Sequence, residues 1–382
     1  MLFLVHKEVI TIKKILFGIT SLTLGGAERV LVDISNKLSE KYDITIFSIY
    51  DNGELKNDLN KNVKFKALYN CRYDELTKLQ KMWIPIKILL FSKIIYNKKI
   101  KQNYDTEIAF LEGPITRLFS TKNKDVQKIA WIHNDIEKVF GNDLKSKIKK
   151  YIDKNIYKKY DDLVFVSQDN MEKFQNIYND LNTENMHVIY NYIDKDLVIK
   201  KSNYNIKVEF DYNSINFLTV CRLVKQKAID RFIRVHSKLI KQGLKHKVYI
   251  IGDGPEKENL QKLIRQENVE DTFILLGKKE NPYPYIKNAN YFCLLSEFEG
   301  YGMVLEEAKI LNKPIIITNT AARECIENYP KALILENSED EIYDGLYKLL
   351  NDNDDKIFNN TQTNTEYDNT EKLQKIIELV GD

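Results

Sequence analysis

Short runs of β-branched and aromatic residues alternate along the chain with longer segments in which apolar residues recur at helical spacing. This alternation is typical of βαβ units, and several runs are apolar on both faces, as a parallel sheet covered by helices requires. The runs predicted as strands are 14–20, 43–50, 63–68, 106–111, 128–133, 163–167, 187–190, 215–220, 247–251, 272–276, 291–295 and 314–318. The segments predicted as helices are 27–40, 85–101, 144–160, 229–242, 256–267 and 303–311.

The same alternation occurs in both halves of the chain, and residues 191–210 between them show no strong period. A polar stretch, 351–369, separates the second half from an amphipathic segment at 371–380. We therefore expect an α/β fold of two Rossmann-like domains, residues 1–195 and residues 196–365. Residues 366–382 are predicted as a C-terminal helix, for which a return to the first domain is one option.

The composition excludes several classes of protein. With 382 residues, 43% hydrophobic and 30% charged, the chain is too apolar and too balanced in charge to be disordered. No segment approaches the ~18 uninterrupted apolar residues of a membrane span, since Lys87 interrupts the best candidate, 82–91. The cysteines are too far apart for a zinc or C-x-x-C motif: Cys71, Cys221, Cys293 and Cys325. Reduced thiols, and hence a soluble intracellular protein, are expected.

The two halves differ in charge. Residues 1–200 hold 33 basic and 26 acidic side chains, a net charge of +7, and the remainder has a net charge of −4. A basic half indicates a domain that faces something anionic, although lysines scattered over solvated surfaces would give the same count. Nucleic acid is not favoured as a partner, because the basic residues form no tract interleaved with aromatic residues.

Glycine is scarce, with 14 residues, yet close pairs of glycines follow predicted strands and precede predicted helices. The pairs are Gly25-Gly26, Gly252 with Gly254, and Gly300 with Gly302. Ligands of open α/β sheets bind at the carboxyl ends of the strands, where glycine lets the backbone approach a phosphate. For any one pair, closing a tight turn explains the glycines equally well; the recurrence favours a phosphate site.

Charged residues lie beside these turns. Glu299 and Glu307 are separated by seven residues across the last glycine pair, where carboxylates suit sugar and ribose hydroxyls better than phosphate. Arg222 and Lys227 lie five residues apart after the first strand of the second half. Two cations on such a loop can hold a diphosphate, whereas either one alone would be interpreted as a solvated surface charge.

Together these motifs resemble glycosyltransferase family 4, the retaining sugar transferases with the GT-B fold, of the type that builds bacterial surface polysaccharides. The resemblance covers nearly the whole chain in the family's order. It rests on Gly25-Gly-Ala-Glu28, Trp131-Ile-His-Asn134, Asn191-Tyr-Ile-Asp194, Arg222 with Lys227, Gly252-Asp-Gly-Pro255, Asn281-Pro-Tyr283, Glu299 with Glu307, and Lys313-Pro-Ile315. The chain departs from the family at Cys221 and Ala228, which replace the usual glycines beside the Arg/Lys loop, and at Ala321-Ala322.

The resemblance implies two Rossmann-like domains facing each other across a cleft, with the acceptor in the first domain and a nucleotide-sugar donor in the second. It implies that Arg222 and Lys227 take the place of a metal ion on the diphosphate, so that neither metal nor cofactor is expected. The nucleotide sugar is a co-substrate. The remaining implied residues are Glu299 for the transferred sugar, Glu307 for the ribose, His133 near the reacting sugar, and Gly25, Gly26, Lys278, Gly300, Tyr301 and Gly302 for binding the donor.

The implied activity is hexosyl transfer, EC class 2.4, from a donor that is commonly UDP-linked to a saccharide, with a lipid-linked intermediate as the expected acceptor. No residue looks like an activated covalent nucleophile, so the acceptor could attack from the face that the phosphate leaves, while Arg222 and Lys227 stabilise the departing charge. Three alternatives stay open: a nucleotide-sugar 2-epimerase of the same fold, a dinucleotide dehydrogenase and a non-catalytic sugar-binding scaffold. The dehydrogenase is disfavoured because no intact G-x-G-x-x-G follows the first strand.

The basic first half also suggests contact with an anionic membrane. Residues 76–104 contain seven lysines and no acidic residue, and residues 144–160 are predicted as an amphipathic helix. One face of that helix carries Lys147, Lys150, Lys154 and Lys158. Ordinary packing and solvation explain the same pattern. The expected location is therefore cytoplasmic, with peripheral contact at the inner face of the cell membrane as an option.

Overall fold

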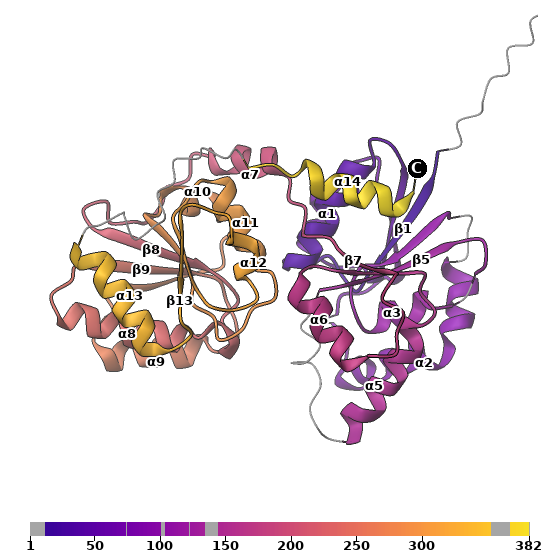
Figure 1. Cartoon of the computed structure of the whole chain (residues 1–382), viewed down its shortest axis with the longest axis horizontal. Coiled ribbons are helices and arrows are strands. Elements are labelled where there is room, and N and C mark those ends of the chain that lie inside the picture. Colours follow the sequence, from indigo (N-terminus) through magenta and orange to yellow (C-terminus); the bar gives the residue numbers. More distant parts are fainter. Residues whose placement is uncertain are drawn as a thin grey trace, which may run out of the picture. The chain divides into compact units, whose positions relative to one another are not determined.

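A computed structural model describes residues 12–73, 75–100, 104–121, 123–133, 144–352 and 367–381 of the chain. The chain divides into two compact units, each a parallel sheet with helices on its faces (Figure 1). Unit 1 comprises Met1–Tyr192 and Glu371–Asp382, and unit 2 comprises Ile193–Thr370. The first unit thus ends at Tyr192, where the sequence predicted residue 195, and it includes the C-terminal segment.

Unit 1 contains a seven-stranded sheet of order β3-β2-β1-β4-β5-β6-β7, in which all neighbours are parallel. Its strands are β1 (Lys14–Ile19), β2 (Asp43–Tyr50), β3 (Lys64–Tyr69), β4 (Thr106–Ala109), β5 (Gln127–Ile132), β6 (Asp162–Phe165) and β7 (Met186–Val188). Its helices are α1 (Gly26–Leu38), η1 (Glu54–Asp58), α2 (Lys78–Ile95) with the π-helical turn η2 (Tyr96–Ile100), α3 (Pro114–Phe119), α5 (Leu144–Tyr157) and α6 (Gln168–Ile177).

Unit 2 contains a six-stranded parallel sheet of order β10-β9-β8-β11-β12-β13. Its strands are β8 (Ile215–Val220), β9 (His246–Ile251), β10 (Phe273–Gly277), β11 (Tyr291–Leu294), β12 (Ile315–Thr318) and β13 (Ala332–Leu335). Its helices are α7 (Lys195–Ser202), η3 (Lys225–Lys227), α8 (Ile229–Lys241), α9 (Lys257–Glu267), α10 (Tyr283–Asn288), α11 (Met303–Ile310), α12 (Arg323–Ile326) and α13 (Glu339–Asp352).

The central strands are buried on both faces because helices cover the two sides of each sheet. β2 is buried from Ile44 to Tyr50, and all of β12 is buried. Such strands need continuous apolar, β-branched sequence, which is why their ranges agree closely with the predicted ones. The strand order reverses between β1 and β4 in unit 1 and between β8 and β11 in unit 2. Each reversal is a topological switch point, where the loops after the strands diverge and leave room for a ligand.

Three details differ from the expectation. The segment 191–210 is not a featureless linker, because the Asp194 side chain accepts a hydrogen bond from Leu197 N (2.9 Å) and caps α7. Helix α2 begins at Lys78 rather than at residue 85, because Thr77 and Gln80 form a capping box and Pro85 is accommodated inside the helix. The edge strand β13 had not been predicted. Most of the polar stretch 351–369 lies outside the described residues.

The last helix, α14 (Thr370–Val380), packs on unit 1 through buried Ile376 and Val380. Gln127 Nε2 at the start of β5 donates to Leu379 O (3.1 Å), and Lys13 Nζ donates to Gly381 O (2.8 Å). The C-terminal segment therefore completes the unit that contains the beginning of the chain.

Each unit buries a polar cluster near the amino ends of its strands. In unit 1, Lys128 Nζ lies 2.5 Å from Glu107 Oε2, and the Tyr96 hydroxyl donates to Glu107 Oε1 (2.7 Å). All three side chains are almost fully buried, and burial lowers the pKa of Lys128. In unit 2, His236 Nδ1 lies 2.8 Å from His246 Nε2. Burial lowers the pKa of His236 to about 2 and that of His246 to about 4, so both are neutral.

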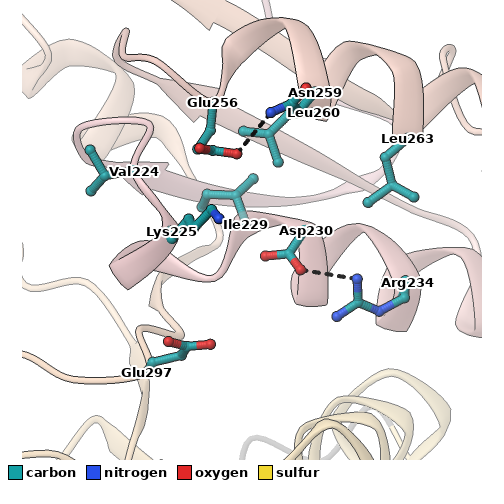
Figure 2. A pocket seen from close by; sticks show the side chains of 10 residues that line it. All are labelled: Val224, Lys225, Ile229, Asp230, Arg234, Glu256, Asn259, Leu260, Leu263 and Glu297. Atoms are coloured by element: carbon teal, nitrogen blue, oxygen red, sulfur yellow. Dashed lines mark hydrogen bonds and ion pairs between the residues drawn. The ribbon is translucent and has the colours of Figure 1, made fainter.

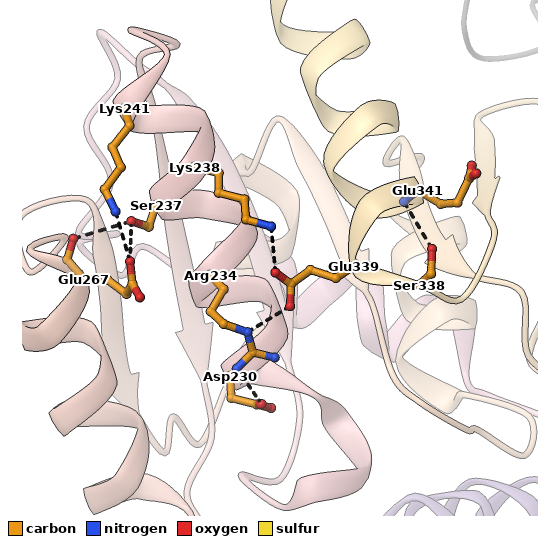
Figure 3. A network of polar contacts seen from close by, with 9 residues as sticks. All are labelled: Asp230, Arg234, Ser237, Lys238, Lys241, Glu267, Ser338, Glu339 and Glu341. Carbon is orange, nitrogen blue, oxygen red and sulfur yellow. Dashed lines mark hydrogen bonds and ion pairs between the residues drawn. The ribbon is translucent and has the colours of Figure 1, made fainter.

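The exposed side of α8 carries paired charges (Figure 3). Arg234 contacts Asp230 (3.0 Å) and Glu339 (2.8 Å), and Lys238 contacts Glu339 (2.9 Å). Lys241 contacts Glu267 of α9 at 3.2 Å. The exposed side of α8 is therefore polar, as expected for a helix that faces water.

Candidate active site

The loop after β8, at the switch point of unit 2, carries the predicted cations. Arg222 is exposed, and its guanidinium has no ion pair or hydrogen bond within the described residues. The loop continues into the short turn η3 and ends at Ala228, which has a left-handed backbone with φ of +47°. A side chain makes this conformation unfavourable by about 1 kcal/mol, so Ala228 keeps the turn at a small cost.

Gly252 and Gly254 pack closely against this loop, so they are not open to a ligand. A Cβ on Gly252 would lie 1.8 Å from Cys221 O, and one on Gly254 would lie 2.3 Å from Leu223 O. The two loops are also joined by a hydrogen bond from Leu223 N to Asp253 O (3.0 Å). The close approach that these glycines permit is therefore between two strand-end loops, and it fixes the backbone on which Arg222 is carried.

Lys227 and Glu299 meet at the switch point, although 72 positions separate them in the sequence. Lys227 Nζ forms an ion pair with Glu299 Oε2, and the Ser296 hydroxyl donates to the same oxygen (3.3 Å). The two side chains are only 16% and 13% exposed. Backbone contacts support the pair, because Glu297 N donates to Gln226 O (2.9 Å) and Gln226 Nε2 donates to Phe298 O (3.0 Å).

Glu307 lies on α11 and is held by a tyrosine. It is 8% exposed, and the Tyr283 hydroxyl donates to its Oε1 (3.1 Å). The helix begins at Met303, directly after Gly302, whose φ of +74° favours glycine, and the Tyr301 hydroxyl donates to Glu306. Burial raises the pKa of Tyr301, so this phenol keeps its proton and ties the Gly300–Gly302 turn to the helix.

Lys278 is exposed directly after β10, at the strand end beyond β9. Asp253 lies within its electrostatic reach: a hydrogen bond from Gly254 N, together with Lys257 and Lys278, holds the pKa of Asp253 below its usual range. The structure thus places the predicted residues of unit 2 at one edge of the sheet, on the loops after the strands, in η3 and, for Glu307, on α11. Direct contact joins Lys227 to Glu299, while Arg222 has no such partner among the described side chains.

In unit 1 the predicted residues lie at the corresponding edge. Gly25 precedes the first residue of α1, Gly26, and the Glu28 carboxylate folds back to within 2.1 Å of the place of a Cβ on Gly25. Burial raises the pKa of Glu28. His133 directly follows β5, and its backbone N donates to Glu112 Oε1 (2.7 Å).

The His133 ring packs against Phe110, with ring centroids 4.8 Å apart. Its Nε2 is buried and has no hydrogen-bond partner among the described residues. Burial lowers the pKa of His133 to about 3. A neutral imidazole with one open nitrogen can hydrogen-bond to a hydroxyl but brings no positive charge. Asn134, the next residue of that motif, lies outside the described residues.

A surface pocket of about 450 Å³ lies in unit 2 but contains none of the predicted site residues (Figure 2). Its lining residues are Val224, Lys225, Ile229, Asp230, Arg234, Glu256, Asn259, Leu260, Leu263 and Glu297. Turn η3 and the segment 297–299 separate it from the site, since Lys225 and Glu297 line the pocket whereas Lys227 and Glu299 meet each other.

Sequence reasoning gave no role to Tyr283, Ser296 or Glu112. Tyr283 lay within a quoted motif and Ser296 at a predicted strand end, but only the fold shows that their hydroxyls reach the two carboxylates. Glu112 could have been found, because it is an acidic residue followed by glycine directly after a predicted strand.

Comparison with known proteins finds similarity to glycosyltransferases. Residues 200–366 match the model of the family described as glycosyl transferases group 1. The chain is 28% identical over 342 residues to the N-acetylgalactosamine-N,N'-diacetylbacillosaminyl-diphospho-undecaprenol 4-alpha-N-acetylgalactosaminyltransferase of Campylobacter jejuni, covering 87% of this chain and 89% of that protein. It is 25% identical over 264 residues to the poly(ribitol-phosphate) alpha-N-acetylglucosaminyltransferase of Staphylococcus aureus, covering 68% and 51%.

Solved structures share the fold. HepE of Anabaena, in complex with UDP and glucose, superimposes with a TM-score of 0.72 at 16% identity, covering 96% of this chain and 99% of that one. A TarM variant of S. aureus, in complex with UDP and other ligands, gives a TM-score of 0.73 at 16% identity, covering 97% and 100%. At this level of identity the likeness shows the two-domain α/β fold alone.

Proposed function

This chain is a glycosyltransferase with the GT-B fold, and on that basis we propose that it transfers a sugar from a UDP-linked donor to a lipid-linked saccharide, with retention of configuration. The observation that carries the proposal is the meeting of Lys227, Glu299 and Ser296 at the switch point of unit 2. The name of the Campylobacter relative, which includes an undecaprenol diphosphate, supports the acceptor class. The complex of HepE with UDP and glucose supports the donor class.

In this proposal the donor diphosphate binds between Arg222 and Lys227. Lys227 is already held at the site by Glu299, so donor binding exchanges one anionic partner for a stronger one and leaves Glu299 available to the sugar hydroxyls. A cation that is fixed before the reaction stabilises the leaving phosphate without reorganisation. Glu307, oriented by Tyr283, accepts from the ribose hydroxyls.

The transfer then needs few chemical groups. The bond between the anomeric carbon and the UDP oxygen breaks as the acceptor oxygen bonds to the same face of that carbon. The acceptor proton passes to the departing phosphate oxygen. Unit 1 contributes the neutral His133, whose open Nε2 suits a hydroxyl of the reacting sugar, and the Gly25-Gly26 loop. The side-chain cations replace a metal, so we propose that the reaction is metal-independent.

A screen of nucleotide sugars tests the donor assignment. A ligand at 100 times its dissociation constant stabilises the folded protein by about 2.7 kcal/mol, which thermal unfolding detects. We expect stabilisation by UDP and by one or a few UDP-sugars, transfer to a polyprenyl-diphosphate saccharide in excess EDTA, and an α-linked product from an α-linked donor by NMR. Inversion, or activity lost with EDTA and restored by Mn²⁺, would contradict the proposal. Conversion of the donor alone would favour the epimerase.

A lipid-linked acceptor places the reaction at a membrane surface, and we propose a peripheral enzyme at its inner face. Among the described residues no helix is long and apolar enough to cross a bilayer. The basic face of α5 is a weaker candidate for the contact than its sequence suggested. Asp180 pairs with both Lys154 (2.7 Å) and Lys158 (3.4 Å), which neutralises part of that face.

A further inference from the structure

Helix α2 of unit 1 is apolar on two opposite faces. One face is buried in the core of the unit through Ile84, Ile88 and Ile95. The opposite face is exposed and consists of residues at intervals of one, three or four positions, which we call the α2 stripe. The stripe comprises Leu79, Met82, Trp83, Ile86 and Leu90, whose exposed fractions run from 37% for Ile86 to 68% for Leu90. The helix kinks at Phe91, and Phe91 itself and Ile94 after it are also exposed.

A helix in this position should carry polar residues on its outer face. Surface helices of soluble proteins are apolar on one side, and a helix that is apolar all round is normally covered on all sides. Helix α8 of unit 2 follows the rule, because its outer face holds ion pairs (Figure 3). A contiguous apolar surface of this kind marks a contact with a partner or a membrane.

The charged residues of helix α2 itself are all of one sign. From Lys78 to Ile100 the chain has no acidic residue, and Lys78, Lys87 and Lys93 are exposed beside the apolar side chains. Two lysines of this helix lie over aromatic rings. Lys81 Nζ is 4.9 Å from the centre of the Tyr73 ring, and Lys87 Nζ is 5.9 Å from the centre of the Tyr69 ring. Apolar side chains bordered by lysines match a surface of acyl chains beneath anionic headgroups.

We propose that the α2 stripe docks the enzyme on an anionic bilayer. The helix would lie in the plane of the interface, since the α2 stripe extends about 18 Å along the helix axis and its five side chains lie on one face. A second copy of the chain is a poorer occupant, because a symmetric contact would bring two sets of lysines together. This inference rests on the proposed function only in explaining why a transferase should meet lipid; the surface itself is independent of the donor site.

Trp83 provides a direct reporter of docking. The chain has two tryptophans, and Trp131 is 1% exposed in the core whereas Trp83 is 57% exposed. We expect the emission of the full-length protein to shift to shorter wavelength with vesicles of phosphatidylcholine and phosphatidylglycerol. Brominated acyl chains should quench it. The Trp83→Phe variant should still co-sediment with these vesicles but lose the shift and the quenching. No shift and no sedimentation at low salt would overturn the proposal.

A matched pair of variants locates the surface. Leu79→Ser/Trp83→Ser removes two exposed apolar residues from α2, and Ile148→Ser/Tyr151→Ser removes two from α5, where they are also exposed. We expect the α2 variant to lower the vesicle partition coefficient about tenfold or more, and the α5 variant to change it less than about threefold. Equal losses, or a loss confined to the α5 variant, would overturn the assignment to α2. So would a dimer in solution that the α2 substitutions dissociate.

Vesicle binding is measured without donor or acceptor, which separates this inference from the proposed function. If UDP-sugars fail to bind but vesicles still do, the activity is wrong and the docking surface stands. If the α2 variant binds UDP-sugar and melts like the wild type yet fails on vesicles, the surface acts in docking alone. Binding that is equal on neutral and anionic vesicles at low salt would remove the role given to the lysines.

Discussion

In unit 2 the paired charges of the candidate site lie at the carboxyl ends of β8 and β11, whereas the most deeply buried charges of unit 1 lie at the amino ends of β4 and β5. The edge of unit 1 where a ligand would bind offers a neutral His133 and a carboxylate, Glu112, that accepts from the backbone. Two parallel sheets with the same reversal of strand order thus differ in where they carry charge. The cations at the strand ends of unit 2 suit a diphosphate, whereas the neutral His133 of unit 1 suits an uncharged saccharide.

The largest effect should come from breaking the buried pair of unit 1. Glu107→Gln leaves Lys128 as a charge almost fully buried without its counterion, which destabilises by about 3–5 kcal/mol. Both tryptophans lie in unit 1, so tryptophan fluorescence during urea unfolding reports that unit, while circular dichroism reports both. Donor binding by unit 2 should persist where the variant is folded.

The control for that prediction is Asp43→Asn, which breaks the exposed Lys64–Asp43 pair of the same unit (2.7 Å). An exposed pair contributes about 0–1 kcal/mol, so this variant should unfold close to the wild type. An equal loss in the free energy of unfolding for the two variants would show that burial does not make the Glu107–Lys128 pair more important for stability than an exposed pair.

The second effect tests the charged edge of unit 2. Lys227→Ala should lower kcat by roughly 10²–10³, the usual result of removing one fixed group that stabilises developing charge. Lys225 lies on the same turn and is exposed, but it does not contact Glu299, so Lys225→Ala is the matched control and should retain most of the turnover. Comparable losses in the two variants would mean that the general charge of the turn, rather than the Lys227 contact, matters.

The third effect is a loss of stability at acidic pH. His246 Nδ1 donates to Leu244 O (2.8 Å), so its Nε2 accepts from His236 Nδ1, and no position is left between the two rings for an added proton. Both pKa values in the folded state lie below the usual 6.5, so the unfolded chain binds more protons and stability falls as the pH drops below about 6.5. By pH 5 the loss should be roughly 1–2 kcal/mol for each histidine.

Urea unfolding between pH 7.5 and 5 measures this loss when circular dichroism, which reports both units, is compared with tryptophan fluorescence, which reports unit 1 alone. The variant His246→Gln, even if less stable throughout, should show a shallower dependence on pH than the wild type. An unchanged slope would mean that the pair is already charged or solvated in the folded protein.

The smallest effects should distinguish Glu307 from the tyrosine that orients it. Glu307→Gln replaces a charged acceptor, and donor affinity should fall roughly ten- to hundredfold, since hydrogen bonds to charged groups contribute about 1.5–3 kcal/mol. Tyr283→Phe removes a hydroxyl that touches the carboxylate rather than the donor, so a loss of about two- to tenfold is expected by calorimetry with UDP. An unchanged affinity for Glu307→Gln would make it an ordinary helix carboxylate.

Strands buried on both faces were predictable because their apolar runs leave no other interpretation. The missed strand β13 is a four-residue edge strand with Ile334 43% exposed, so it lacks that signal. The start of α2 was misplaced because Pro85 resembles a first helical residue, while the capping box that begins the helix starts at Thr77, about two turns earlier. Helix α7 shows no clear apolar period, because Val198 is its only buried apolar residue.

The residues of the candidate site were predictable as types and positions but not as contacts. Motif spacing and family resemblance selected Lys227 and Glu299, yet their pairing depends on β8 and β11 being neighbours across a change in strand order. For the same reason the sequence could not show that Ser296 and Tyr283 reach the carboxylates. The exposure of the α2 stripe also required the structure, since its apolar residues would serve equally well in a core.

Because of helix α14, the two units are not completed in the order in which their synthesis begins. Its residues are translated after all of unit 2, yet Ile376 and Val380 are buried against unit 1. Domains fold as they emerge from the ribosome, so unit 2 can finish while the first unit still lacks its last helix. During that interval the surface that α14 will cover is open to chaperones and proteases, and a ribosome that stalls after residue 370 would release a chain whose second unit is whole and whose first is not.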